Sequence, residues 1–112
     1  EAAPLNPSDL YMLKGNYGGK FTYPLVPGAE GSGTVIASGG GYMGWKLMGK
    51  RVGFTRQAER GGNFSKNGSY AEYCTTNAFQ CITLDDPNVT FEQGACSFVN
   101  PVTAIGLLEK SK

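Results

Sequence analysis

The stretch from Pro24 to Val35 constrains the fold more than any other part of this chain, because prolines and glycines surround a single acid there. The prolines fix the backbone φ angle and disfavour helix before them. The glycines flank Glu30 and remove side chains where the backbone must pass close to other groups. We therefore predict an extended segment that becomes a β-strand, with Glu30 held between small residues.

The chain of 112 residues is long enough for one small domain with one core. It is 40% hydrophobic and 17% charged, and its apolar runs are far shorter than the roughly 20 residues of a transmembrane helix. A net charge of +1, with basic residues mixed among acids, gives no electrostatic case for binding nucleic acid or an anionic membrane. The sequence starts without an initiator Met, which indicates a fragment or a processed piece.

Local patterns predict a mainly β chain with terminal helices. Short runs with strand character occur at residues 33–38, 50–55, 69–74 and 79–84, separated by turn residues. Asn6, Pro7 and Asp9 predict the start of a helix over residues 10–13. A capping box at residues 90–93 predicts a helix over residues 95–99, and another helix is expected from Pro101 to Lys110.

Cys74, Cys81 and Cys96 are odd in number and widely spaced, which argues against a disulfide framework. The chain has no His and no Cys-x-x-Cys pair, so we expect no structural zinc site. We interpret the three cysteines as small apolar residues of a protein in a reducing compartment.

Residues 39–44 match the Gly-x-Gly-x-x-Gly spacing of a dinucleotide-binding turn. That fingerprint needs a strand before it and a helix after it. Residues 45–50 are too few for the helix and are soon followed by another strand. We therefore predict a hairpin tip here and no cofactor site.

Four side chains are candidates for chemistry, each with a structural alternative. Tyr17 lies in a Gly-flanked loop, where its hydroxyl could donate a proton, or its ring could simply pack. Glu30 could act as a general base, but we favour a structural acid that accepts hydrogen bonds from nearby backbone N–H groups. Asn100 and Thr103 place a carboxamide and a hydroxyl near a helix start, which is also where ordinary capping residues occur.

Taken in order, the sequence blocks resemble the catalytic domain of medium-chain dehydrogenases/reductases: APLNPSD (3–9), GNYG (15–18), PGAEGSGTV (27–35), GKRV (49–52), GSYAEY (68–73) and NPVTA (100–104). Within that superfamily the chain is most similar to zinc-independent quinone oxidoreductases and mitochondrial 2-enoyl thioester reductases. The resemblance implies a GroES-like partial β-barrel over residues 1–98, lacking its first strands. Residues 99–112 would begin a connector helix to a Rossmann domain that this chain lacks.

The resemblance also implies a function for the full-length protein. It would use NADPH, bound mainly by the Rossmann domain, to reduce a quinone or an α,β-unsaturated carbonyl or thioester. Zinc members carry His where Ala29 stands and a Cys ligand near the first short helix, so zinc is not expected here.

By the same resemblance, Tyr17 corresponds to the catalytic proton donor. Asn100 and Thr103 correspond to residues that contact the nicotinamide nucleotide. Asn6 and Tyr11 correspond to residues that line the substrate cleft near the nicotinamide, where Asn6 also contacts the cofactor.

The resemblance implies a small-molecule substrate, a homodimer when full-length, and an intracellular location that is cytoplasmic or mitochondrial. We expect no nucleic-acid or membrane partner, and we expect the fragment alone to be inactive. The alternative is a non-catalytic GroES-like module that serves as a structural or binding subunit.

Overall fold

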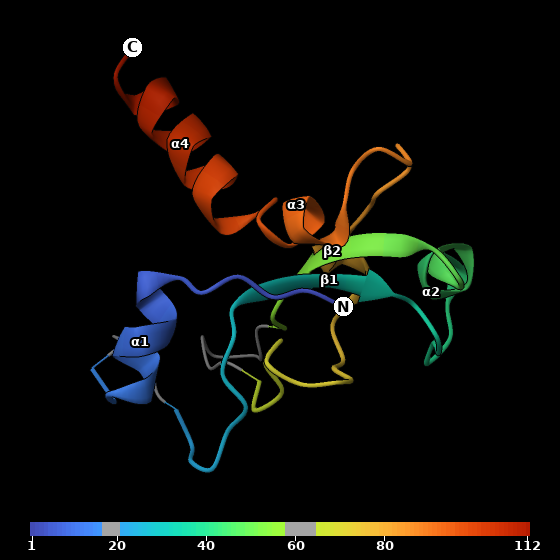
Figure 1. The fold of residues 1–112 in the computed structure, drawn as a ribbon, viewed down its shortest axis with the longest axis horizontal. Helices are drawn as coiled ribbons and strands as arrows, with labels where there is room; N and C mark the ends of the chain where they lie inside the picture. Colours follow the sequence, from blue (N-terminus) through green and yellow to red (C-terminus); the bar gives the residue numbers. More distant parts are fainter. Residues whose placement is uncertain (17–20, 58–64) are drawn as a thin grey trace.

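The computed structural model describes residues 1–16, 21–57 and 65–112 of the chain. Figure 1 shows a small sheet with short helices around it and one long helix, α4, that projects from the body. The elements in chain order are α1 (Pro7–Leu13), β1 (Glu30–Thr34), α2 (Tyr42–Leu47), β2 (Arg51–Thr55), the 3-10 helix η1 (Ala78–Gln80), β3 (Cys81–Thr83), α3 (Phe91–Ala95) and α4 (Val99–Lys110).

The sheet is antiparallel with strand order β1-β2-β3, and Glu30 at the start of β1 faces Thr55 at the end of β2. β1 begins at Glu30, earlier than the predicted strand at residues 33–38. Its outer edge is held by Ala2, whose N–H and carbonyl both bond to Ser32. A Cβ at Gly31 would lie 3.0 Å from the Phe54 ring and 3.1 Å from the Ala2 carbonyl oxygen, which confirms that backbone passes close to other groups here.

The expectation of a mainly β chain is wrong for the described residues. Strands of 5, 5 and 3 residues stand beside α-helices of 7, 6, 5 and 12 residues, and the described strands form an open sheet, with no closed barrel. The physical reason is that the Pro- and Gly-rich segments run extended without forming regular ladders.

The strand predicted at residues 69–74 is one such case, because this segment forms bends. Its backbone instead donates to the proline-rich segment: the Gly68 N–H bonds to the Val26 carbonyl and the Tyr70 N–H bonds to the Pro27 carbonyl, each at 3.0 Å. Pro27 has no N–H to donate in return, so a regular ladder cannot form.

The hairpin tip predicted at residues 39–44 is also wrong in part, because α2 begins at Tyr42. Gly41 precedes it with a φ of 80°, a conformation that favours glycine. Leu47 at the end of α2 is buried, and this burial is what stabilises so short a helix. The later strand over residues 79–84 is confirmed only as β3, with η1 before it.

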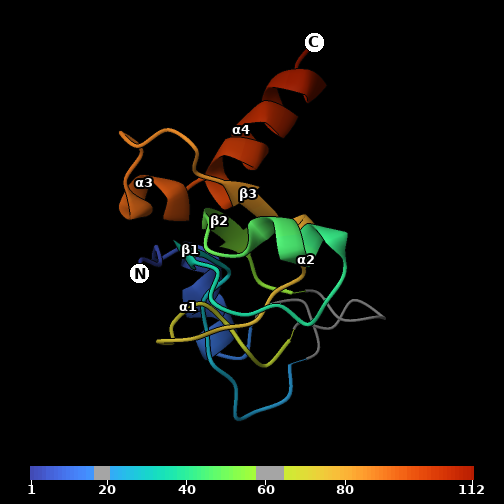
Figure 2. The ribbon, with the colours of Figure 1, turned by 90° about the vertical axis from the view of Figure 1, so that its right-hand side faces the viewer.

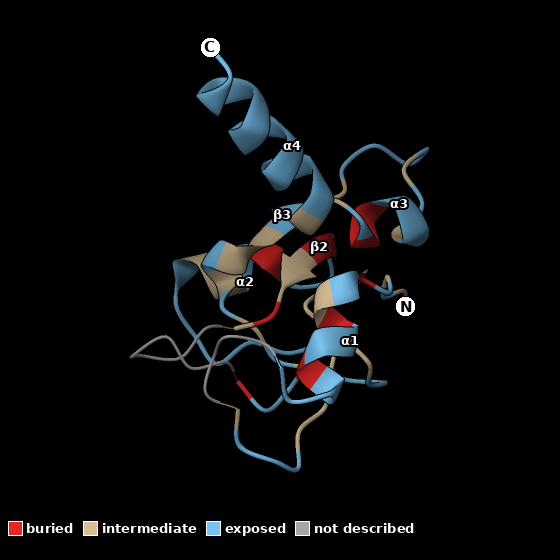
Figure 3. Ribbon diagram, turned by 90° about the vertical axis from the view of Figure 1, so that its left-hand side faces the viewer, coloured by how far each residue is buried: buried red, intermediate tan, exposed pale blue. Residues whose placement is uncertain are grey.

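The buried apolar side chains among the described residues are few: Met12, Leu47, Val52 and Ala95. Figure 3 shows buried positions on α1, β2 and α3. Polar residues outnumber the apolar ones in the interior, namely Asn6, Asp9, Glu30, Ser32, Arg56, Ser65 and Ser69. Because a buried polar group is costly unless it is hydrogen-bonded, these residues must be connected to one another or to the backbone.

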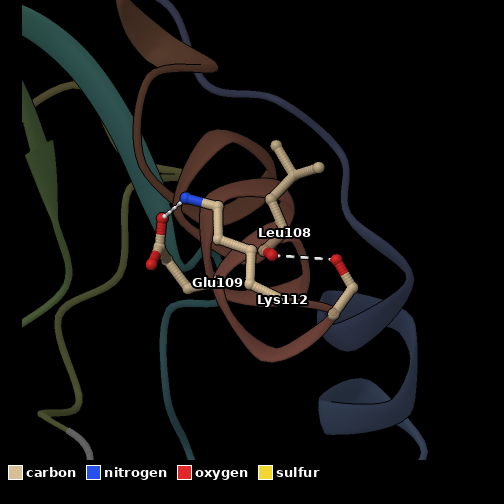
Figure 4. Close-up of polar contacts among 4 residues, drawn as sticks. Leu108, Glu109 and Lys112 are labelled. Carbon is tan, nitrogen blue, oxygen red and sulfur yellow. Dashed lines mark hydrogen bonds and ion pairs between the residues drawn. The ribbon is translucent and has the colours of Figure 1, made fainter.

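The predicted C-terminal helix is confirmed as α4, which has no buried residue among its twelve, all of them described. Figure 2 shows it extending away from the sheet, and Ile105, Leu107 and Leu108 are all more than half exposed. At its end, Lys112 Nζ lies 2.7 Å from Glu109 Oε1, and the Ser111 hydroxyl donates to the Leu108 carbonyl (Figure 4). An exposed pair of this kind contributes about 0.2–1 kcal/mol. None of the helices in the described part has the length and apolar character to cross a bilayer.

Candidate functional site

Glu30 lies at the centre of a buried hydrogen-bond network and is completely inaccessible to solvent. Its Oε1 accepts from Asn6 Nδ2 at 3.0 Å. Its Oε2 accepts from the backbone N–H groups of Phe98 at 3.1 Å and Val99 at 2.9 Å. The interpretation of Glu30 as a structural acid is therefore confirmed, because both carboxylate oxygens are already occupied by donors.

Asn6 connects this carboxylate to the next candidate residue. It is the N-cap of α1, and its backbone N–H donates to Asp9 Oδ2 at 2.9 Å. While Nδ2 donates to Glu30, Asn6 Oδ1 accepts from Asn100 Nδ2 at 3.5 Å. Two residues predicted to contact the cofactor thus meet, although 94 positions separate them in the sequence.

Two of the remaining predicted site residues lie on the same two helices and are exposed to solvent. Tyr11 lies on the exposed side of α1, and Thr103 lies on the exposed surface of α4, where its hydroxyl donates to the Val99 carbonyl at 2.6 Å. Tyr17 lies outside the described residues. The flanks of its segment are attached to α1, because the Asn16 N–H bonds to the Tyr11 carbonyl and the Tyr23 hydroxyl bonds to a main-chain carbonyl of the same helix. The chemical roles assigned to these residues stay predictions.

A second buried cluster surrounds Asp9 and was not predicted from the sequence. Asp9 has no exposed surface; its Oδ2 accepts from Asn6 and from the Tyr70 hydroxyl at 3.1 Å, while its Oδ1 has no hydrogen-bond partner in the described part of the chain. Arg56 is buried nearby and donates from Nε to the Ser65 carbonyl at 2.7 Å. Burial lowers the pKa of Arg56, and the negative charge of Asp9 partly opposes this effect.

The Asp9 cluster predicts a specific dependence of stability on high pH. Burial, then the charge of Asp9 and its hydrogen bond, raise the pKa of Tyr70 from 10.0 to about 12. The folded chain therefore holds this proton more tightly than the unfolded chain, and the associated stability is complete below pH 10 and lost as the pH rises toward 12. We expect urea unfolding to show a steeper loss of stability over this range for the wild type than for Tyr70→Phe.

Tyr42→Phe is the control for this experiment, because Tyr42 is exposed on α2. It should follow the wild-type pH dependence. Parallel curves for the wild type and Tyr70→Phe would mean that Asp9 and burial do not retain the Tyr70 proton on folding.

The three cysteines are free thiols. Burial raises the pKa of Cys74 and of Cys81, whereas Cys96 is exposed. A raised pKa leaves less thiolate at neutral pH and so makes a thiol a poorer nucleophile or ligand. The described ranges contain no group of three or more His, Cys, Asp or Glu side chains placed to hold a metal ion.

Comparison with known proteins gives a family match and several relatives. The alcohol dehydrogenase GroES-like domain family matches residues 1–86. A zinc-type alcohol dehydrogenase-like protein of Schizosaccharomyces pombe is 34% identical over the whole chain, and the mitochondrial enoyl-[acyl-carrier-protein] reductase of Bos taurus is 53% identical over 40% of it. The chain covers 32% and 12% of these two relatives, so it spans a third of their length or less.

One solved structure extends the comparison to three dimensions. It is a Mesorhizobium loti protein assigned as an NADPH:quinone reductase, and it superimposes on 96% of the chain with a TM-score of 0.80 and 38% sequence identity. The chain corresponds to 29% of that protein.

Proposed function

The chain belongs to the alcohol dehydrogenase GroES-like domain family, within the medium-chain dehydrogenase/reductase superfamily, and from this premise we propose the activity of the full-length protein. It is an NADPH-dependent reductase of a quinone or of an α,β-unsaturated carbonyl or thioester, and it works without zinc. The described residues supply one wall of the nicotinamide and substrate cleft.

The observation that carries this proposal is the contact of Asn6 with Asn100, at 3.5 Å between Oδ1 and Nδ2. It joins the N-terminal ends of α1 and α4, the two helices that also present Tyr11 and Thr103 to solvent. Four of the five predicted site residues therefore lie on or at the start of these two helices, and the fifth, Tyr17, comes a few residues after the end of α1 in the sequence.

The exposed groups on α4 fit the chemistry of a nicotinamide. Its carboxamide needs both a hydrogen-bond donor and an acceptor, and the exposed Asn100 side chain offers both. Thr103 uses its hydroxyl proton within the helix, so its oxygen is left to accept. Asn100 and Thr103 would hold this end of NADPH, which supplies a hydride to the acceptor when bound.

The side chains around Glu30 do not offer a zinc site. Ala29 has no ligand atom, both Glu30 oxygens accept hydrogen bonds from other groups, and the chain contains no His. Zinc in catalytic sites needs three protein ligands from Cys, His or acidic side chains. A neutral hydroxyl is then the group that would assist the reaction, and in this proposal it belongs to Tyr17.

The residues of this chain have distinct tasks in the proposed reaction. Tyr17 supplies a proton, or stabilises the oxyanion that develops as the acceptor is reduced. Tyr11 lines the cleft beside the acceptor, and Asn6 and Asn100 keep the start of α4 beside α1. Orientation of this kind lowers the barrier because the reacting groups are already placed.

The full-length protein should consume NADPH when it is given a quinone or crotonyl-thioester, measured as loss of NADPH absorbance. A preference for one of the two acceptors would identify the substrate class. If the folded, full-length protein neither binds NADPH nor consumes it with either acceptor, the reductase proposal fails. A non-catalytic GroES-like module would then be the better description.

A further inference from the structure

Glu30 joins two helices that lie far apart in the sequence, α1 and α4. Its carboxylate accepts from the side-chain amide of Asn6, the N-cap of α1, and from the N–H groups of Phe98, the N-cap of α4, and Val99, its first residue. These donors lie 24, 68 and 69 positions away in the sequence. One buried side chain at the start of β1 therefore fixes both helices relative to the sheet.

The placement of α4 depends strongly on this carboxylate. The first N–H groups of a helix have no partner within the helix, and a negative charge there meets the positive end of the helix dipole. No residue of α4, all of which is described, is fully buried, and of its residues only Val99 at its start is half-buried, so side-chain packing within this chain contributes little to its orientation. Within the described part of the chain, its other hydrogen bond to a separate element is the long one from Asn100 to Asn6.

The same carboxylate fixes which way the Asn6 amide faces. A carboxylate only accepts hydrogen bonds, so the Asn6 nitrogen must point toward Glu30. Asn6 Oδ1 is then left to face the Asn100 amide nitrogen. Reversing the Asn6 amide would place two nitrogen donors against each other.

We propose that Glu30 is a positioning residue for the nicotinamide cofactor, acting through Asn6 and the first turn of α4. It does not touch the cofactor. It fixes the orientation of the Asn6 amide and the position of the helix that carries Asn100 and Thr103. This inference rests on the proposed reductase function, and its test separates the two.

The test compares three variants of the full-length protein: Glu30→Gln, the double variant Glu30→Gln with Asn6→Asp, and Glu92→Gln. A glutamine at position 30 offers the α4 backbone only a weaker, neutral acceptor, and its NH₂ group faces the Asn6 nitrogen and forces that amide to turn. The added carboxylate at position 6 can accept from this NH₂ group and still accept from Asn100, so it should restore the arrangement. Glu92 is the matched control, because it is an exposed acid in the first turn of α3.

We expect Glu30→Gln to raise the KM for NADPH about tenfold with a smaller change in kcat, consistent with the loss of one or two buried hydrogen bonds. Hydrogen–deuterium exchange at residues 98 and 99 should rise by about the same factor. The double variant should recover most of both losses, and Glu92→Gln should match the wild type.

The proposal is overturned if Glu30→Gln folds and behaves like Glu92→Gln in both measurements. It is also overturned if the double variant folds without rescue, or if neither Glu30 variant folds, because Glu30 would then serve stability alone. A wild type that never uses NADPH would remove the reductase proposal. Faster exchange at residues 98 and 99 in Glu30→Gln would in that case still establish the link between β1 and α4.

Discussion

Replacing Gly68 by Ala should lower the free energy of unfolding by roughly 3 kcal/mol or more, a large fraction of the total stability of a small domain. A Cβ at this position would lie less than 3.0 Å from the carbonyl oxygens of both Pro27 and Val26, closer than Cβ atoms approach other atoms in proteins. Both oxygens are backbone atoms, so no flexible side chain can move to make room. The Gly68 N–H also donates to the Val26 carbonyl, and the added methyl group would break this contact.

Gly39→Ala is the matched control, because a Cβ added there would have no atom within 4 Å and the φ angle of Gly39 is not in the positive range. It should leave stability unchanged or raise it by about 0.4–1 kcal/mol, since alanine reduces the freedom of the unfolded chain. The measurement is the midpoint of urea unfolding of Gly68→Ala compared with that of Gly39→Ala. Equal midpoints would show that the segment at residues 26–28 can move away from Gly68 at little cost.

The Gly68 contact illustrates what could not be predicted from the sequence. The alternation at residues 69–74 resembles a strand, but whether it pairs depends on the partner segment. That partner contains Pro27 and lies about 40 positions earlier, so the outcome is decided by tertiary contact. The strand predicted at residues 50–55 does form, as β2. Its neighbours β1 and β3 have free backbone groups to pair with it on both sides, so tertiary contact agrees with the local pattern.

Helix starts were predicted more successfully because their signals are local. Thr90 and Gln93 form the expected capping box, with the Thr90 N–H donating to Gln93 Oε1 and the Gln93 N–H to Thr90 Oγ1. Asn6 and Asp9 likewise mark the start of α1. In each case the partners are three positions apart, so their spacing alone suffices.

The candidate site was predicted in part for the same reason. The small residues around Glu30 indicate a structural acid, but they do not reveal that its donors are Asn6 and the start of α4. Tyr70 was missed because nothing in its own segment shows that its hydroxyl bonds to Asp9, and Arg56 because nothing shows that the charge of Asp9 acts on it. The composition of a segment indicates that a polar residue is buried. The hydrogen-bond partner of that residue comes from a distant segment, so it is identified only from the folded structure.

Tyr17→Phe should reduce the turnover of an enoyl thioester by the full-length protein roughly 100- to 10,000-fold, the usual contribution of a positioned acid or base. The substitution removes one hydroxyl and keeps the ring, so the loss measures the hydroxyl alone. The KM for NADPH should stay close to the wild-type value, because the cofactor contacts proposed on α4 belong to Asn100 and Thr103.

The control for this prediction is Tyr42→Phe, which removes a hydroxyl from an exposed position on α2 and should not affect turnover. If Tyr17→Phe reduces the thioester as fast as the wild type, Tyr17 is not the proton donor. A loss of NADPH binding with unchanged turnover at saturation would instead assign Tyr17 to the cofactor. A fall in kcat that leaves cofactor binding intact would place the Tyr17 hydroxyl at the reacting atoms. A group at the reacting atoms stabilises the transition state and contributes little to the binding of the cofactor.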